Sequence, residues 1–124
     1  MLNGLKILVL EDNLVIAMDV ELLLQDCGAE VVETVATANA ALAKLANFSP
    51  DVAVLDINLD SGTSLPVAEA LLARGIPFIF ATGYSDPSML PEAFAHVDIL
   101  PKPFEASALE GALSEAYQRR KTQG

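Results

Sequence analysis

Short apolar segments alternate with helical patterns along the whole chain, and this alternation constrains the fold more than any other feature. Five segments have the length and the apolar composition of buried strands: residues 6–10, 31–35, 52–55, 77–81 and 97–100. Regular alternation favours right-handed crossovers and a parallel sheet with helices on both faces. Because five such units are too few for an eight-fold barrel, we expect an open, doubly wound α/β sheet.

The fourth helix is expected to be short. Pro87 and Pro91 fall within residues 83–97, and a proline in a helix interior costs about 3 kcal/mol. We therefore expect only a helical turn from about Pro91 to Phe94. The other helices have start and stop signals at their ends: Asn13, Thr37 or Asn39, Pro66 and Glu105 at the starts, Gly28 and Gly75 at the stops.

Composition and charge exclude several classes of protein. The 124 residues fit one domain, and the apolar runs are far shorter than the roughly 18 residues of a membrane span. The first residues lack the layout of a secretory signal, so we expect a cytoplasmic protein with no membrane partner. A formal net charge of −10 repels phosphate backbones, which argues against nucleic-acid binding. The basic residues at 119–121 are explained by the preference of cations for a helix C-terminus.

Polar side chains collect at the carboxyl ends of the predicted strands. Glu11 and Asp12 follow the first strand, and Asp56 ends the third. Thr82 ends the fourth strand, and Lys102 follows the fifth. Because parallel strands end at one edge of a sheet, and ligands bind beyond that edge, we expect these side chains to converge. One acidic residue after a strand is often a helix cap, but three acids at one edge are not explained that way.

The predicted group has the chemistry of a metal-dependent phosphate site. Three carboxylates supply the hard oxygen ligands that Mg²⁺ prefers, without a cluster of histidine or cysteine nearby. A carboxylate beside Mg²⁺ can attack a phosphoryl group as a nucleophile. Lys102 can pair first with the free carboxylate and then with phosphoryl oxygens, and Thr82 can donate its hydroxyl to another of these oxygens.

This ordered set of residues resembles the response-regulator receiver domains of two-component signalling, over essentially the full length of the chain. The matching motifs are Glu11-Asp12, Asp56 within Leu55-Asp56-Ile57-Asn58-Leu59, Thr82, and Lys102-Pro103-Phe104. The resemblance implies a flavodoxin-like sheet with strand order 2-1-3-4-5. It also implies that residues 1–124 form a single, stand-alone receiver domain with no output domain.

For function, the resemblance implies a phosphate-accepting signalling switch and not an enzyme. A histidine kinase or a histidine phosphotransfer protein would transfer its phosphoryl group to Asp56. Thr82 would then move toward the phosphate and reshape the surface that a downstream protein contacts. The implied ligands of the Mg²⁺ are Glu11, Asp12, Asp56 and the backbone carbonyl of Asn58. The sequence leaves two roles open: a shuttle or phosphate sink in a phosphorelay, and a regulator that binds a target.

One position departs from the usual receiver pattern. Many receivers have Tyr or Phe three residues before the lysine, and here that position is Ile99. The run Phe80-Ala81-Thr82-Gly83-Tyr84 resembles a subgroup of receivers named for its Phe-Ala-Thr-Gly motif, which commonly lacks this aromatic residue. We therefore expect residues 83–91, including Tyr84, to move in place of the missing aromatic side chain.

Two other functions fit the residues less well. A Mg²⁺-dependent hydrolase with an aspartyl-phosphate intermediate usually needs a second acid two residues beyond the nucleophile, where this chain has Asn58. A flavin- or nucleotide-binding module would leave the acids and Lys102 unexplained, and the first strand lacks a glycine-rich turn after it. Among the remaining polar residues, His96 is expected to face solvent, Cys27 to be a buried structural residue, and residues 61–64 to form a loop that ends in a helix cap.

Overall fold

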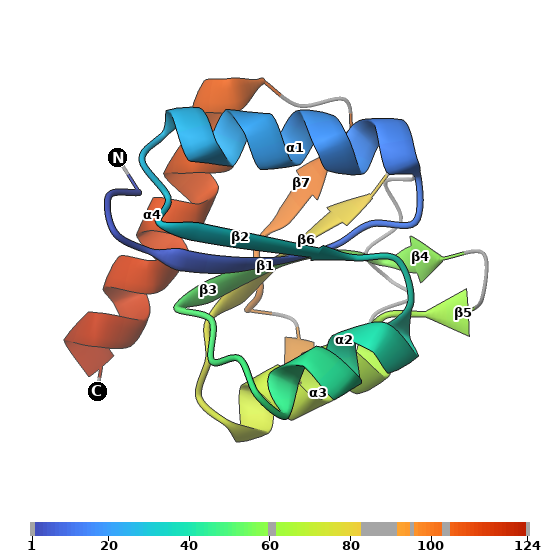
Figure 1. Cartoon of the computed structure of the whole chain (residues 1–124). Helices are drawn as coiled ribbons and strands as arrows, with labels where there is room; N and C mark the ends of the chain where they lie inside the picture. The colour runs from blue at the N-terminus through green and yellow to red at the C-terminus, as the bar shows by residue number, and fades with distance from the viewer. Residues whose placement is uncertain (1, 60–61, 83–91, 95, 103–104, 124) are drawn as a thin grey trace.

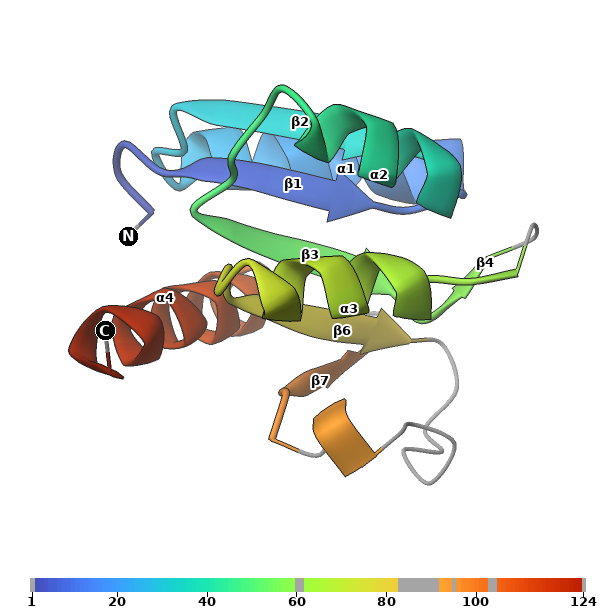
Figure 2. The same ribbon diagram turned by 90° about the horizontal axis from the view of Figure 1, so that it is seen from below.

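A five-stranded parallel sheet forms the centre of the computed structural model, which describes residues 2–59, 62–82, 92–94, 96–102 and 105–123. The strands lie side by side in the order β2 (Val31–Val35), β1 (Lys6–Leu10), β3 (Val52–Asp56), β6 (Phe78–Thr82) and β7 (Ile99–Pro101). Counted along the chain within this sheet, that order is 2-1-3-4-5, so the predicted topology is confirmed. The arrows of β1, β3 and β6 point the same way in Figure 2, and their carboxyl ends therefore share one edge.

Helices cover both faces of the sheet (Figure 1). α1 (Leu14–Asp26) and α4 (Ala106–Gln123) lie on one face, and α2 (Ala38–Leu45) and α3 (Leu65–Ala73) lie on the other. Because successive strand residues point to opposite faces, each strand contributes to both cores. The side of α1 and α4 buries Ile7, Val9, Val54, Ile79, Leu24 and Leu113, and the side of α2 and α3 buries Leu8, Leu10, Leu55, Phe80, Leu45 and Leu71.

Side-chain caps fix the starts of the first two helices. The side-chain oxygen of Asn13 accepts two backbone N–H groups of the first turn of α1, at 3.0 and 3.2 Å. Thr37 caps α2, where its hydroxyl accepts the N–H of Ala40 at 3.0 Å, so the sequence alternative of Asn39 is not used. Each cap satisfies a donor that the first turn of a helix leaves unpaired. The cap at Asn13 also starts α1 immediately after the acidic pair.

The segment after Asp56 differs from the prediction. Residues 61–64 were expected to form a loop, but β4 (Asn58–Leu59) pairs with β5 (Gly62–Thr63) in an antiparallel hairpin. Leu59 of β4 is buried in the core on the side of α2 and α3, which fixes one of the two short strands. The expected cap is present in another form: Ser64 occupies the N-cap position of α3 but its hydroxyl donates to the carbonyl oxygen of Ile57 at 3.5 Å, and the hydroxyl of Thr63 accepts the N–H of Leu65 at 3.4 Å.

A 3₁₀ turn, η2 (Glu92–Phe94), lies where a short helical turn was expected, among the residues that the structure describes between β6 and β7. Phe94 is buried and packs edge-to-face on Phe78 and Phe80, with ring centroids 6.1 and 5.8 Å away. This contact anchors the turn to the sheet next to β7, where Ile99 is in register with Phe80. The predicted movement of residues 83–91 lies outside the described residues.

Candidate functional site

Backbone hydrogen bonds hold the ends of the strands together at the carboxyl edge of the sheet. The N–H of Glu11 donates to β2 at 3.0 Å, and the N–H of Ile57 donates to β6 at 3.1 Å. The N–H of Lys102 donates to the carbonyl oxygen of Thr82 at 2.8 Å. Each bond joins the residue after one strand to the neighbouring strand, which continues the parallel ladder past its last paired residue. The ladder therefore fixes the positions from which the acids and the lysine extend.

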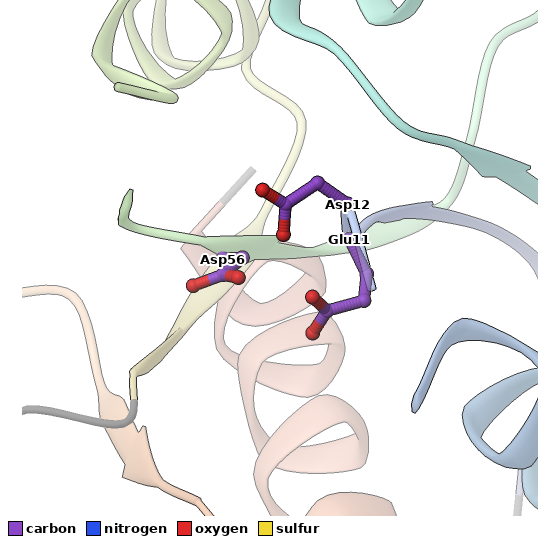
Figure 3. Close-up of side chains that lie close together, drawn as sticks. All are labelled: Glu11, Asp12 and Asp56. Atoms are coloured by element: carbon purple, nitrogen blue, oxygen red, sulfur yellow. The ribbon is translucent and has the colours of Figure 1, made fainter. Parts of the chain in front are cut away.

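The three acidic residues predicted from the sequence converge at this edge (Figure 3). One carboxylate oxygen each from Glu11, Asp12 and Asp56 lies within 4.8 Å of the others. Glu11 and Asp56 are only 6% and 8% exposed, and Asp12 is half-buried. Ligand oxygens around an octahedral Mg²⁺ are about 3 to 4 Å apart, so small side-chain adjustments bring these oxygens to one ion.

Lys102 bridges two of the acids. Its Nζ donates to Oδ2 of Asp56 at 3.1 Å and also to Oε1 of Glu11. The other carboxylate oxygen of Glu11 accepts the backbone N–H of Asn13 at 3.1 Å. The lysine side chain is 16% exposed, so this ammonium compensates carboxylate charge in a partly desolvated setting.

Burial raises the pKa of the Asp56 carboxyl from 3.8 to about 6. The hydrogen bond from Lys102 lowers this pKa, but the nearby charge of Glu11 raises it further. Burial also lowers the pKa of Lys102, yet its hydrogen bonds to Glu11 and Asp56 outweigh burial, and the net direction is upward. The ionised form of Asp56 is thus disfavoured in the fold, and a cation bound beside it would stabilise that form.

The remaining predicted residues lie at the same edge. Thr82 is buried at the end of β6, one residue beyond Ala81, which is in register with Asp56. Asn58 belongs to β4, two residues after Asp56. The structure therefore brings all the sequence-predicted positions to one end of the sheet, while the roles of the individual side chains stay predictions.

Two residues outside the site behave largely as the sequence indicated. His96 is exposed, as predicted. Cys27 is a free cysteine that is partly and not fully buried. Burial raises the pKa of its thiol, and the charge of Glu110 adds to this effect, which makes the thiol a poor nucleophile at neutral pH.

Two features next to the acids were not predicted from the sequence. One is the N–H of Asn13, which holds Glu11; a hydrogen bond of this kind leaves no pattern in a sequence. The other is an apolar stripe on the outer face of α1, which we call the α1 stripe. Among the described residues, six large apolar side chains are exposed, and the stripe contains four of them: Leu14 (73%), Val15 (69%), Met18 (55%) and Leu22 (60%).

The spacing of the α1 stripe explains why it was missed. At 100° per residue its four positions fall within about 100° of the helix circumference, beside the acidic pair. The buried face of α1 is also apolar, with Ala17, Val20 and Leu24. A helix that is apolar on both faces gives no periodic signal that separates the inner from the outer positions.

Comparisons with known proteins agree with this geometry. Residues 7–114 match the family model of the response regulator receiver domain. The phyllosphere-induced regulator PhyR of Methylorubrum extorquens is 31% identical over 115 residues, a match that covers 90% of this chain and 43% of that protein. The chain thus spans less than half the length of this curated relative.

Solved structures show the same fold. The solution structure of SdrG from Sphingomonas melonis is 42% identical, with a TM-score of 0.78 over 93% of this chain and 97% of that one. The receiver domain of PhyR from Erythrobacter litoralis is 28% identical, with a TM-score of 0.79 over 92% and 90% of the two chains. In the described part of the chain, no helix has the length and hydropathy needed to cross a membrane. The chain belongs to the response regulator receiver domain family of two-component signalling.

Proposed function

We propose that this receiver domain is a Mg²⁺-dependent switch in which Asp56 accepts a phosphoryl group from phosphohistidine. The observation that supports this most is the surroundings of the Asp56 carboxylate. It is buried, two further carboxylates approach it within 4.8 Å, and the ammonium of Lys102 lies 3.1 Å away. A cluster of this kind is costly for the fold, and phosphoryl transfer is a chemistry that uses every member of it.

The donor set suits a hard divalent cation. Glu11, Asp12 and Asp56 offer only oxygen ligands, and the backbone carbonyl of Asn58 would add another. Mg²⁺ held by these residues supplies charge stabilisation for the oxygens of the transferring phosphoryl group. The raised pKa of Asp56 fits this proposal, because a carboxylate that is unfavourable alone is stabilised by a bound cation.

The transfer itself assigns a role to three side chains. A carboxylate oxygen of Asp56 forms the new bond to phosphorus while the bond between phosphorus and the donor imidazole nitrogen breaks, and the electron pair of that bond stays on the nitrogen. Lys102, which pairs with Asp56 at 3.1 Å, would bind a phosphoryl oxygen after transfer. The hydroxyl of Thr82 donates to another oxygen, and its movement would report phosphorylation to the surface.

The α1 stripe supports a protein as the phosphoryl donor. The stripe begins two residues after Asp12, whose carboxylate lies near that of Asp56. A partner that covers the stripe would therefore lie next to Asp56. Exposed apolar surface next to an acceptor site is typical of a protein contact. We therefore propose a histidine kinase or a histidine phosphotransfer protein as the donor. Residues 1–124 would act as one receiver unit in the cytoplasm, where ATP maintains the phosphohistidine.

The proposal is tested by NMR spectroscopy with Mg²⁺ and beryllofluoride, which mimics a phosphoryl group on a carboxylate. We expect amide shifts around Asp56, Thr82 and Lys102 in the wild-type protein and none in Asp56→Asn. Asp51→Asn is the matched control, because Asp51 lies just before the opposite end of the same strand and should leave the response intact. A wild-type spectrum that does not change would overturn the switch.

The fate of the phosphoryl group defines two versions of the switch. In one, the group passes to a second histidine in a phosphorelay; in the other, a downstream protein binds the phosphorylated form. A pull-down that compares beryllofluoride-treated with untreated protein distinguishes them. A target that only the treated form retains supports the regulator. Transfer of a labelled phosphoryl group from Asp56 to an added histidine phosphotransfer protein supports the shuttle.

A further inference from the structure

A cavity of about 300 Å³ lies at the end of the sheet opposite the acidic residues. Its lining residues come from the start of β6, from the segments before β6 and β7, from the end of α3 and from the second half of α4. Phe78, at the start of β6, lines the cavity, whereas Thr82 ends the same strand about 13 Å away. The cavity is therefore separate from the site around Asp56, and its volume is at the lower limit of small-molecule sites.

The inner wall of the cavity is apolar. Ile76, Phe78, Val97 and Ala116 line it, and Phe78 and Ala116 are only 6% and 7% exposed. Phe78 is held in place by edge-to-face contact with Phe80, at a centroid distance of 5.5 Å. A wall of this kind favours an apolar body over water.

The rim of the cavity is polar and contains a guanidinium. Nη2 of Arg119 donates to Oδ2 of Asp98 at 2.5 Å, and both side chains are 45% exposed. His96 lies on the same rim. A guanidinium has five N–H donors in a planar fork, so Arg119 can bind a second anionic group while it keeps its bond to Asp98.

The charge of the chain makes this rim unusual. The protein carries a formal net charge of −10 and only 7 Lys and Arg residues, yet three of these seven are consecutive at positions 119–121. Cations are favoured at a helix C-terminus, which explains why basic residues lie near the end of α4. This preference does not explain why one guanidinium lies beside an apolar cavity. Arg119 is the member of this run that lines the cavity, where its charge is partly offset by Asp98, so the rim offers an anion a donor that most of this acidic surface lacks.

We propose that the cavity binds a small organic anion with a short apolar body. The apolar part packs against Ile76, Phe78 and Val97, and the anionic group accepts hydrogen bonds from Arg119. This binding needs neither Mg²⁺ nor Asp56, so it stands independently of the proposed phosphoryl transfer.

NMR titration with hexanoate tests the proposal. We expect saturable amide shifts for residues that line the cavity and none for Glu11, Asp12 or Asp56. Acetate lacks the apolar body and hexylamine reverses the charge, so each should bind about tenfold more weakly or worse, a difference of about 1.4 kcal/mol. Equal binding of hexanoate and hexylamine, or no saturable shift at the cavity with hexanoate, would overturn the proposal.

Substitutions of single residues test whether hexanoate binds in the cavity itself. Arg119→Gln, at an exposed position, should weaken hexanoate binding about tenfold without unfolding the protein. Ala116→Leu fills the cavity while it keeps every charge, and it should abolish binding. Lys44→Gln removes a half-exposed cation on α2 and should leave binding unchanged, as should Asp56→Asn. Undiminished binding to Arg119→Gln shows that the guanidinium is not the anion ligand and contradicts the proposal.

Discussion

The two ends of the central sheet use the same strands for opposite purposes. At the carboxyl end, Glu11, Asp56 and Lys102 are brought together with little access to solvent. At the amino end, the carboxylate of Asp51 accepts the N–H of Lys6 at 2.8 Å, and the N–H of Asp51 donates to the carbonyl oxygen of Lys6 at 2.7 Å. At the carboxyl end, carboxylates of like charge lie close together and repel one another. At the amino end, the carboxylate of Asp51 takes part in the backbone hydrogen bonding.

The carboxyl end is the part of the fold that is less stable than it could be. The raised pKa of Asp56 means that its ionised form is less favourable in the fold than in water, and Lys102 compensates only part of this effect. The amino end contains no comparable conflict among the described residues. We therefore expect substitutions at the amino end to leave metal binding unchanged, and substitutions at the carboxyl end to change metal binding and folding in opposite directions.

The largest effect on folding is expected for a core residue near the amino end. Leu24 is fully buried between α1 and the sheet, and Leu24→Ala should lower the free energy of unfolding by about 3–5 kcal/mol. Chemical denaturation with and without Mg²⁺ measures this, and the stabilisation by Mg²⁺ should equal that of the wild type. If Mg²⁺ stabilised Leu24→Ala less than the wild type, the two ends of the sheet would not act independently.

The next largest effect is expected for the lysine at the carboxyl end. Lys102→Met leaves the buried carboxylates of Glu11 and Asp56 without their shared cation, and in Mg²⁺-free buffer it should cost about 2–3 kcal/mol. Mg²⁺ should recover part of this loss. The control is Lys44→Met, which removes an exposed pair with Glu33 and should cost less than about 1 kcal/mol. Equal losses in the free energy of unfolding for Lys102→Met and Lys44→Met would show that burial does not increase the contribution of the Lys102 ion pairs.

A gain in stability is expected when the carboxylate of Asp56 is neutralised. Asp56→Asn should raise the free energy of unfolding by about 1–2 kcal/mol at pH 8 without Mg²⁺, because an ionised group with a raised pKa destabilises the fold. The gain should shrink as the pH falls from about 6 to about 4, where the wild-type carboxyl becomes protonated in the fold.

The control for this gain is Asp51→Asn at the amino end, which should not stabilise the protein. Thermal and chemical denaturation across this pH range measures both variants. A constant difference between Asp56→Asn and the wild type at every pH would contradict the link to titration of Asp56.

The smallest effect on folding is expected for Lys102→Arg. The charge is kept, so the free energy of unfolding should change by less than about 1 kcal/mol. Phosphorylation by acetyl phosphate should nevertheless slow, because a planar guanidinium does not take the place of a compact ammonium. Phosphorylation at the wild-type rate would show that only the charge at this position matters.

Much of the fold could be read from local pattern. The strand at Val31–Val35 and the helix start after Asn13 agree with the prediction because β-branched runs and side-chain caps act over a few residues. The convergence of the acids with Lys102 was also predictable, because topology alone places the carboxyl ends of parallel strands together. The β4–β5 hairpin was not, since it depends on Leu59 reaching a core that other segments build.

Periodicity and the order of the elements along the chain were enough to predict a parallel α/β sheet and the positions that gather at its carboxyl edge, whereas the strand order was implied by the family resemblance. Only the tertiary structure decided which face of α1 is exposed, that Lys102 bridges Glu11 and Asp56, and that a cavity opens beside Arg119. Those features depend on burial and on distances between residues far apart in the chain, which have no counterpart in local sequence pattern.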